Sequence, residues 1–134
     1  YKAFSGTAVY TTTIDKVPVA DGIKLDLGFV AENASVYLNG DYIGTVIDSP
    51  YQLYIPAEKF KGQDELVVRV ANSMANRIAY MDKKGVDWKI FYNVNMSARK
   101  KENVKNGIFD ASDWEPKSSG LLGPVTLTPA MVKQ

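Results

Sequence analysis

The chain has 134 residues, with 16 lysines and arginines against 15 aspartates and glutamates, a formal net charge of +1. A balance this even creates no strong field toward nucleic acid or a membrane surface, and we expect neither as a partner. The chain contains no cysteine and no histidine. Disulfides, thiolate chemistry, histidine-activated nucleophiles and histidine-ligated zinc are therefore excluded.

Short runs in which apolar and polar residues alternate, separated by turn residues, predict β-strands. In chain order these runs are residues 8–14, 23–27, 35–46, 51–55, 65–71 and 124–128, with one helical turn at 57–60. We find no sustained helical period. This pattern predicts an all-β fold, an antiparallel β-sandwich or jelly roll. We expect residues 8–14 and 125–128 to lie side by side in one sheet, because the ends of a domain are often close together.

Residues 35–46, SVYLNGDYIGTV, contain the clearest local signal in the chain. Asn39-Gly40 favours a two-residue type I′ turn, since Asn tolerates a positive φ and Gly adopts one freely. The predicted hairpin pairs Leu38 with Asp41, Tyr37 with Tyr42 and Val36 with Ile43.

Residues 72–119 form a long interval without clean alternation, and they include Trp88, Phe91, Tyr92, Phe109 and Trp114. So many aromatic side chains argue against disorder. We expect an ordered excursion that folds over one end of the sandwich, with at least one tryptophan mostly buried against strand residues. It could include a short strand at 89–93.

Two uses of these aromatic residues remain open. Trp88, Tyr92 and Trp114 could form a platform for a sugar ring, with Asn93 and Asp87 binding hydroxyl groups. Alternatively, the aromatic rings fasten the excursion onto the sandwich, which is the commoner role of such residues and the favoured one here.

Polar residues of the interval give further candidates. Asn76 and Arg77 follow the strand at 65–71 and complete the set of candidate carbohydrate-binding residues, although an ion pair from Arg77 to Asp82 or another acid is favoured. The acids of the interval are Asp82, Asp87, Asp110, Asp113 and Glu115. Glycoside hydrolysis needs two opposed carboxylates. Because acids in polar loops are usually solvated or cap turns, we predict no catalytic residue, and an independent hydrolase is the weakest alternative.

Several motifs occur in an order that resembles a known family. They are FSGTAVY at 4–10, VYLNG at 36–40, LVVRVAN at 66–72, NR at 76–77, GVDW at 85–88, FY at 91–92, FDAS at 109–112, Trp114 and SGLLGPV at 119–125. Together they resemble the sugar-binding-type β-sandwich of glycoside hydrolase family 2. They are most similar to the C-terminal domain of the α-L-rhamnosidases of glycoside hydrolase family 106.

The resemblance implies a galactose-binding-like jelly roll whose catalytic carboxylates lie on a separate barrel domain. We therefore interpret residues 1–134 as a single β-sandwich domain excised from a larger secreted or periplasmic glycoside hydrolase. Residues 72–119 are the excursion within it. The implied partner is the catalytic domain of the same polypeptide, which this domain supports. A carbohydrate-binding module for plant-type glycans is the alternative. No cofactor and no metal ligand is predicted, although related jelly rolls often hold a structural calcium.

Overall fold

The computed structural model describes residues 3–15, 21–91 and 100–131, and it divides the chain into two compact units. The sandwich unit comprises Thr7–Asn72 and Ser119–Gln134. The insertion unit comprises Tyr1–Gly6 and Ser73–Ser118.

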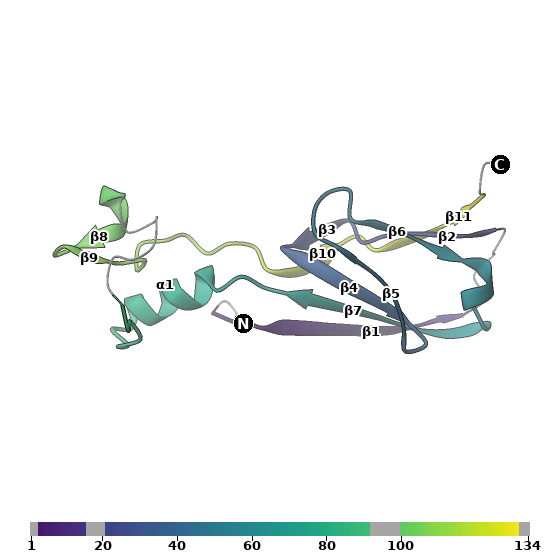
Figure 1. The fold of residues 1–134 in the computed structure, drawn as a ribbon, viewed down its shortest axis with the longest axis horizontal. Coiled ribbons are helices and arrows are strands. Elements are labelled where there is room, and N and C mark those ends of the chain that lie inside the picture. The colour runs from purple at the N-terminus through teal and green to yellow at the C-terminus, as the bar shows by residue number, and fades with distance from the viewer. Residues whose placement is uncertain (1–2, 16–20, 92–99, 132–134) are drawn as a thin grey trace. The chain divides into compact units, whose positions relative to one another are not determined.

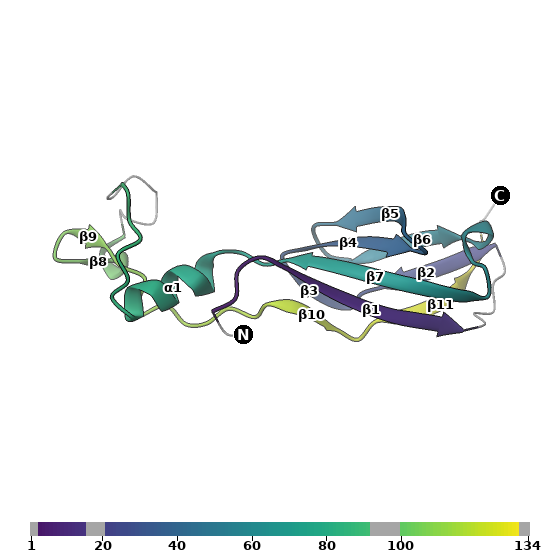
Figure 2. The same cartoon turned by 90° about the horizontal axis from the view of Figure 1, so that it is seen from below.

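The sandwich unit consists of antiparallel sheets (Figures 1 and 2). A four-stranded sheet has the order β1 (Thr7–Asp15), β7 (Gln63–Ala71), β4 (Asn33–Leu38), β5 (Asp41–Val46). A three-stranded sheet has the order β11 (Thr126–Ala130), β2 (Gly22–Asp26), β6 (Gln52–Pro56), and β10 (Gly120–Gly123) pairs with β3 (Phe29–Ala31). The predicted helical turn is a 3-10 turn at Ala57–Lys59.

The apolar faces of these sheets meet in one core. Alternation along β7 places Leu66, Val68 and Val70 inside and Glu65 and Arg69 outside. The other buried core members are Ile14, Leu25, Leu27, Val30, Ala34, Val36, Leu38, Val46 and Ile55. The prediction of an all-β antiparallel sandwich is confirmed.

The predicted pairing of the chain ends is wrong. β1 lies at the edge of the four-stranded sheet, where its ladder with β7 runs from Thr7 opposite Ala71 to Asp15 opposite Gln63. β11 instead pairs with β2 in the three-stranded sheet. Proximity of two termini does not determine which sheet each strand joins, because that choice depends on non-local partners. β11 also begins later than expected, after Pro124, which has no N–H for a ladder.

The predicted hairpin between β4 and β5 is confirmed at its tip. Asn39 has φ 53° and Gly40 has φ 84°, as a type I′ turn requires. Leu38 faces Asp41 and Tyr37 faces Tyr42, but Val36 faces Gly44 and not Ile43. A β-bulge between the Tyr37–Tyr42 and Val36–Gly44 pairs adds one residue, Ile43, to β5. It shifts the register of all pairs farther from the turn by one residue.

Replacing Gly40 with valine is expected to lower the free energy of unfolding by about 1–3 kcal/mol, because a β-branched residue is strained at positive φ. No atom lies within 4 Å of a Cβ built at Gly40, so the backbone conformation alone causes the loss. Urea titration measures it, with Gly40→Asn as control, since Asn tolerates this conformation. Equal stability of both variants would contradict the turn assignment.

A buried carboxylate holds this hairpin tip to the start of β7. The carboxylate of Asp64 accepts hydrogen bonds from Asn39 Nδ2 (2.6 Å), Lys61 N (2.8 Å) and Gly62 N (3.1 Å). Burial raises the pKa of Asp64, but the hydrogen bonds outweigh it and lower the pKa below its ordinary value. Asn39 Oδ1 in turn accepts from Glu65 N at 3.0 Å. The turn is thus fixed by tertiary contacts as well as by its own sequence.

The two points where the sandwich unit gives way to the insertion unit are joined by a hydrogen bond. Asn72 Oδ1 accepts from Gly120 N at 2.9 Å. Asn72 is the last residue of the sandwich unit before the insertion, and Gly120 lies just after its end. We call this pair the neck.

The insertion unit contains a helix that we had not predicted, α1 (Ala75–Lys83), a 3-10 turn at Lys101–Asn103, and a small ladder of β8 (Val104–Lys105) with β9 (Ile108–Phe109). α1 ends in a Schellman motif, in which Val86 N donates to Met81 O and Gly85 has φ 65°. The suggested strand at 89–93 is absent over residues 89–91, and residues 92 and 93 lie outside the described residues.

Candidate functional site

The insertion unit has its own small apolar cluster. Phe109 and Ala111 are buried, and Ile78 of α1, Trp88 and Trp114 pack against them. The rings of Phe109 and Trp114 meet edge to face with centroids 5.8 Å apart. Both tryptophans therefore contribute to the packing of the insertion unit, where Trp114 contacts Phe109 of β9. The prediction that the excursion folds over one end of the sandwich stays a prediction.

Asp82 of α1 is the polar centre of this cluster. Its side chain is 1% exposed and accepts from Trp88 Nε1 (2.6 Å), Lys89 Nζ (2.6 Å) and Ala111 N (2.8 Å). One carboxylate thus joins the helix to the segment after it and to the segment that follows β9. Arg77, its suggested partner, instead places its guanidinium 5.9 Å from the centre of the Tyr80 ring.

Asn76 ties the beginning of α1 to the end of the insertion. Its Nδ2 donates to Lys117 O and its Oδ1 accepts from Lys117 N, both at 2.8 Å. The Asn76 amide thus bonds both the N–H and the C=O of Lys117, as a backbone peptide group does in a β-ladder. It fixes the course of residues 112–117 beside the helix.

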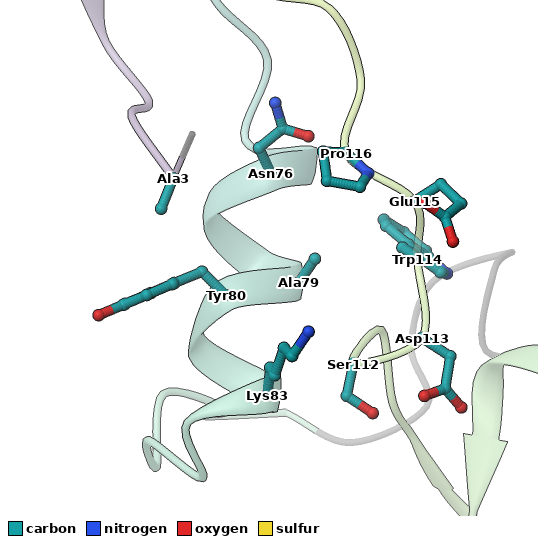
Figure 3. Close-up of a pocket in the computed structure, with 10 residues that line it drawn as sticks. All are labelled: Ala3, Asn76, Ala79, Tyr80, Lys83, Ser112, Asp113, Trp114, Glu115 and Pro116. Carbon is teal, nitrogen blue, oxygen red and sulfur yellow. The ribbon is translucent and has the colours of Figure 1, made fainter. Parts of the chain in front are cut away.

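A cavity of about 560 Å³ lies between α1 and this returning segment (Figure 3). α1 contributes residues at helical spacings of three, four and seven, which lie on one face. The lining comprises Asn76, Ala79, Tyr80 and Lys83 from α1, Ser112, Asp113, Trp114, Glu115 and Pro116 from the returning segment, and Ala3. All of them belong to the insertion unit. We call this space the α1 cavity.

Two charged groups of the α1 cavity are unpaired. Among the residues that the structure describes, Lys83 Nζ and the Glu115 carboxylate form no ion pair and no side-chain hydrogen bond. Figure 3 shows the Lys83 ammonium turned toward the space between α1 and residues 112–116, while Tyr80 extends to the opposite side. The cavity therefore offers a free donor, the Lys83 ammonium, beside the apolar groups of Ala79 and Pro116.

A second polar group lies at the rim, around Lys105. Its ammonium donates to Ser112 Oγ (2.6 Å) and pairs with Asp110 (3.4 Å) and Asp113 (3.0 Å). The hydrogen bond to Asp113 raises the pKa of Lys105. A hydrogen bond from Ser112 Oγ, opposed by burial, lowers the pKa of Asp110. Lys105 is therefore a poor base for Ser112, and Asp110 is a poor general acid.

The structure places four of the six predicted site residues in the insertion unit. Asn76 and Trp114 line the α1 cavity, Trp88 donates its indole N–H to Asp82, and Arg77 lies on the exposed side of α1. Tyr92 and Asn93 lie outside the described residues. The platform of Trp88, Tyr92 and Trp114 stays a prediction.

The helical residues of the cavity, Ala79, Tyr80 and Lys83, were not among the predicted site residues. The signal that could have found them is the Lys84-Gly85 pair, a helix C-terminus signature, behind a run of good helix formers. The described residues contain no cluster of three or more possible acidic metal ligands. Over the same residues, no helix is long and apolar enough to cross a membrane.

The chain is similar to short segments of several glycoside hydrolases. No family model matches it. A rhamnosidase from Novosphingobium sp. PP1Y is similar in structure, with a TM-score of 0.71 and 30% identity over 94% of this chain and 11% of its own. A protein from Formosa agariphila that carries the provisional name beta-glucuronidase is 33% identical over 94% of this chain and 12% of its own length. A beta-D-mannosidase from Dictyoglomus thermophilum shares the fold, with a TM-score of 0.53 and 20% identity over 92% of this chain and 16% of its own.

These matches describe a segment and not a whole enzyme. The chain spans about one eighth of the length of the Formosa relative and about one ninth of the rhamnosidase. The match to the rhamnosidase leaves out only 6% of this chain, too little to omit the insertion. The rhamnosidase therefore has a counterpart of the insertion unit as well as of the sandwich.

Proposed function

We propose that the chain is a non-catalytic accessory domain of a glycoside hydrolase similar to the rhamnosidases, and that it docks on and supports the catalytic part of the same polypeptide. The supporting observation is that 94% of the chain matches 11% of the Novosphingobium rhamnosidase. Most of such an enzyme lies outside this segment. The same likeness supports a secreted or periplasmic parent of the α-L-rhamnosidase family.

The described acids favour a non-catalytic role. Glycoside hydrolysis needs one carboxyl group that holds a proton near neutral pH and a second, opposed carboxylate. Asp82 is occupied by three donors, and the pKa of Asp110 is lowered and not raised. The acids of the insertion unit therefore have structural roles or face solvent.

The outer face of the four-stranded sheet is the surface best suited to docking. Cross-strand register aligns Thr11, Val67, Tyr37 and Tyr42 in one row, and Val9, Arg69, Ser35 and Thr45 in the next. The Arg69 guanidinium lies 4.9 Å from the Tyr37 ring centre, and the rings of Tyr37 and Tyr42 are 5.5 Å apart. Val9 and Tyr42 are 58% and 59% exposed.

This face has the composition of a protein contact. Tyrosine and arginine are enriched in interfaces and among the residues that dominate binding energy. Here they are already held in place by one another, so little side-chain freedom is lost on binding. The occupant we assign is the remainder of the same polypeptide, because the similar enzymes continue well beyond this segment.

Charge reversal at Arg69 tests the docking face. In the longest polypeptide that contains this chain, Arg69→Glu is expected to lower the melting temperature by several degrees more than it does in the isolated chain. The isolated chain should lose only the cation–π contact, about 0.5–1 kcal/mol. Lys24→Glu, at the exposed position of β2 in the other sheet, is the matched control and should affect both forms equally.

Equal effects of Arg69→Glu in the two forms would contradict docking through this face.

The isolated chain, incubated with aryl α-L-rhamnosides and other aryl glycosides, is expected to release nothing above background. Turnover that disappears in Asp87→Asn or Asp110→Asn would overturn the non-catalytic assignment.

A further inference from the structure

β1 forms an unpaired edge of the four-stranded sheet. The strand is nine residues long, and its ladder with β7 occupies one of its two edges (Figure 1). Among the residues that the structure describes, no strand pairs with the other edge, since β1 comes first in the strand order of this sheet. Alternate residues of β1 therefore direct both their N–H and their C=O groups away from β7.

The other edges of the two larger sheets carry devices that prevent pairing, and β1 carries none. Native sheets protect an edge with a bulge, a proline, a charged residue or a very short strand. β5, the opposite edge of the same sheet, contains the bulge at Ile43. In the three-stranded sheet, Pro129 lies within β11, and β6 has five residues and ends at Pro56. β1 has a continuous ladder, no proline and no charged residue before Asp15.

The side of β1 that continues the core face is also open. Tyr10 lies opposite Val68 and Thr12 lies opposite Leu66 in the ladder with β7. Val68 and Leu66 are buried in the core, and directly opposite residues share a face of the sheet. Tyr10 and Thr12 are nevertheless exposed. A strand added at this edge would shield both side chains and pair the free backbone groups at the same time.

A second copy of the same strand fits this edge. Thr11 is the midpoint of β1, so an antiparallel pair with its two-fold axis at Thr11 aligns all nine residues of both copies. Threonine pairs, and pairs of an aromatic with a β-branched residue, stabilise antiparallel strands. No two like charges face each other in this register. The cross-strand pairs are Thr11–Thr11, Tyr10–Thr12, Val9–Thr13, Ala8–Ile14 and Thr7–Asp15.

We propose that β1 is a homodimerisation edge, at which two copies of the chain pair their β1 strands antiparallel about Thr11. The two four-stranded sheets then join into one continuous sheet. Main-chain hydrogen bonds supply the affinity, as in other cases of strand addition. Because the larger sheets offer one such edge per copy, the contact closes on itself and gives a dimer and not a fibre. Docking on the parent enzyme uses the outer face of the sheet and not this backbone edge, so either proposal can fail alone.

Sedimentation velocity of the chain tests the dimer. Between micromolar and millimolar concentrations, a reversible shift from monomer to dimer is expected, with no larger species. Thr11→Lys places two ammonium groups opposite each other at the axis and should weaken dimerisation several-fold. Thr45→Lys adds the same charge at an exposed position of β5, the other edge of the sheet, and should leave dimerisation unchanged. Equal effects of the two lysines would overturn the proposal.

A monomer at millimolar concentration would overturn it as well. If the β1 amides then exchange slowly only in the longest polypeptide that contains this chain, the edge is covered by the parent enzyme and not by a second copy.

A pair of charge variants tests the register. In the pairing about Thr11, Val9 of each copy faces Thr13 of the other. Val9→Glu combined with Thr13→Lys places opposite charges across the interface and should preserve the dimer. Val9→Glu combined with Thr13→Glu places like charges there and should weaken dimerisation at least about tenfold. Amide dispersion confirms that each variant is folded. Equal dimerisation of the two folded double variants would overturn the assignment.

Discussion

Asp82→Ala is expected to unfold the insertion unit while the sandwich unit stays folded. The substitution leaves the Trp88 indole N–H, the Ala111 N–H and the Lys89 ammonium without their common acceptor. Removing one partner of a buried ion pair typically costs about 3–5 kcal/mol. A unit of about fifty residues has a stability of roughly 3–7 kcal/mol at the usual value per residue. The loss is therefore a large part of what holds this unit together.

The measurement uses the tryptophans, since both residues, Trp88 and Trp114, belong to the insertion unit. Tryptophan fluorescence should report unfolding at low urea, while the far-ultraviolet dichroism of the strands reports the sandwich at higher urea. Asp87→Ala is the control, because Asp87 is exposed and lies in the same segment. If Asp82→Ala and Asp87→Ala have the same fluorescence midpoint, Asp82 is not the centre of the unit.

Asp64→Ala is the second large change, and it acts on the sandwich unit. Asp64 is 2% exposed, and its removal leaves the Asn39 amide and the N–H groups of Lys61 and Gly62 without their acceptor in a partly buried site. Lost hydrogen bonds to a charged acceptor predict a decrease of about 2–4 kcal/mol in the free energy of unfolding. Glu65→Ala changes the exposed neighbour and should cost well under half of that. Chemical denaturation measures the free energy of unfolding of both variants, and an equal loss in the two would contradict the role of Asp64.

The same carboxylate gives a pH dependence whose sign follows from its lowered pKa. Because the unfolded chain binds the proton at the ordinary value and the folded chain only at a lower one, the stabilisation is present above the ordinary value. It is lost as the pH falls through the folded pKa. The difference in unfolding free energy between wild type and Asp64→Asn should therefore shrink from neutral pH to about pH 3. A difference that stays constant would contradict this account.

Local features of the fold could be predicted from the sequence, and non-local ones could not. The Asn39-Gly40 turn and the alternation of β7 depend on neighbouring residues, and both were predicted correctly. The bulge in β5 and the separate sheets of β1 and β11 depend on contacts between distant strands. A sequence pattern of period two gives the buried face of a strand but not its partner.

The candidate site was harder to predict because a helix forms half of it. α1 has no side-chain hydrogen bond at its N-cap, so the sequence carries no capping signal for its start. The helix packs only Ile78 against the small cluster, and the apolar period of its sequence is therefore weak. Over its described residues, 73–91 and 100–118, the interval belongs to a compact unit, as its aromatic residues indicated. Their individual contacts could not be foreseen, since Asp82 looked like one of several solvated acids until the fold brought three donors to it.

The neck has a consequence for how this architecture can change. Because Asn72 and Gly120 are hydrogen-bonded to each other, the chain of the sandwich unit is held together where the insertion begins and ends. The entropy of closing a loop grows only slowly, by about 0.6 kcal/mol for each doubling of its length. Lengthening, shortening or replacing everything beyond the neck therefore costs the sandwich little. The insertion unit can therefore be exchanged as a whole while the strand ladders of the sandwich unit are kept.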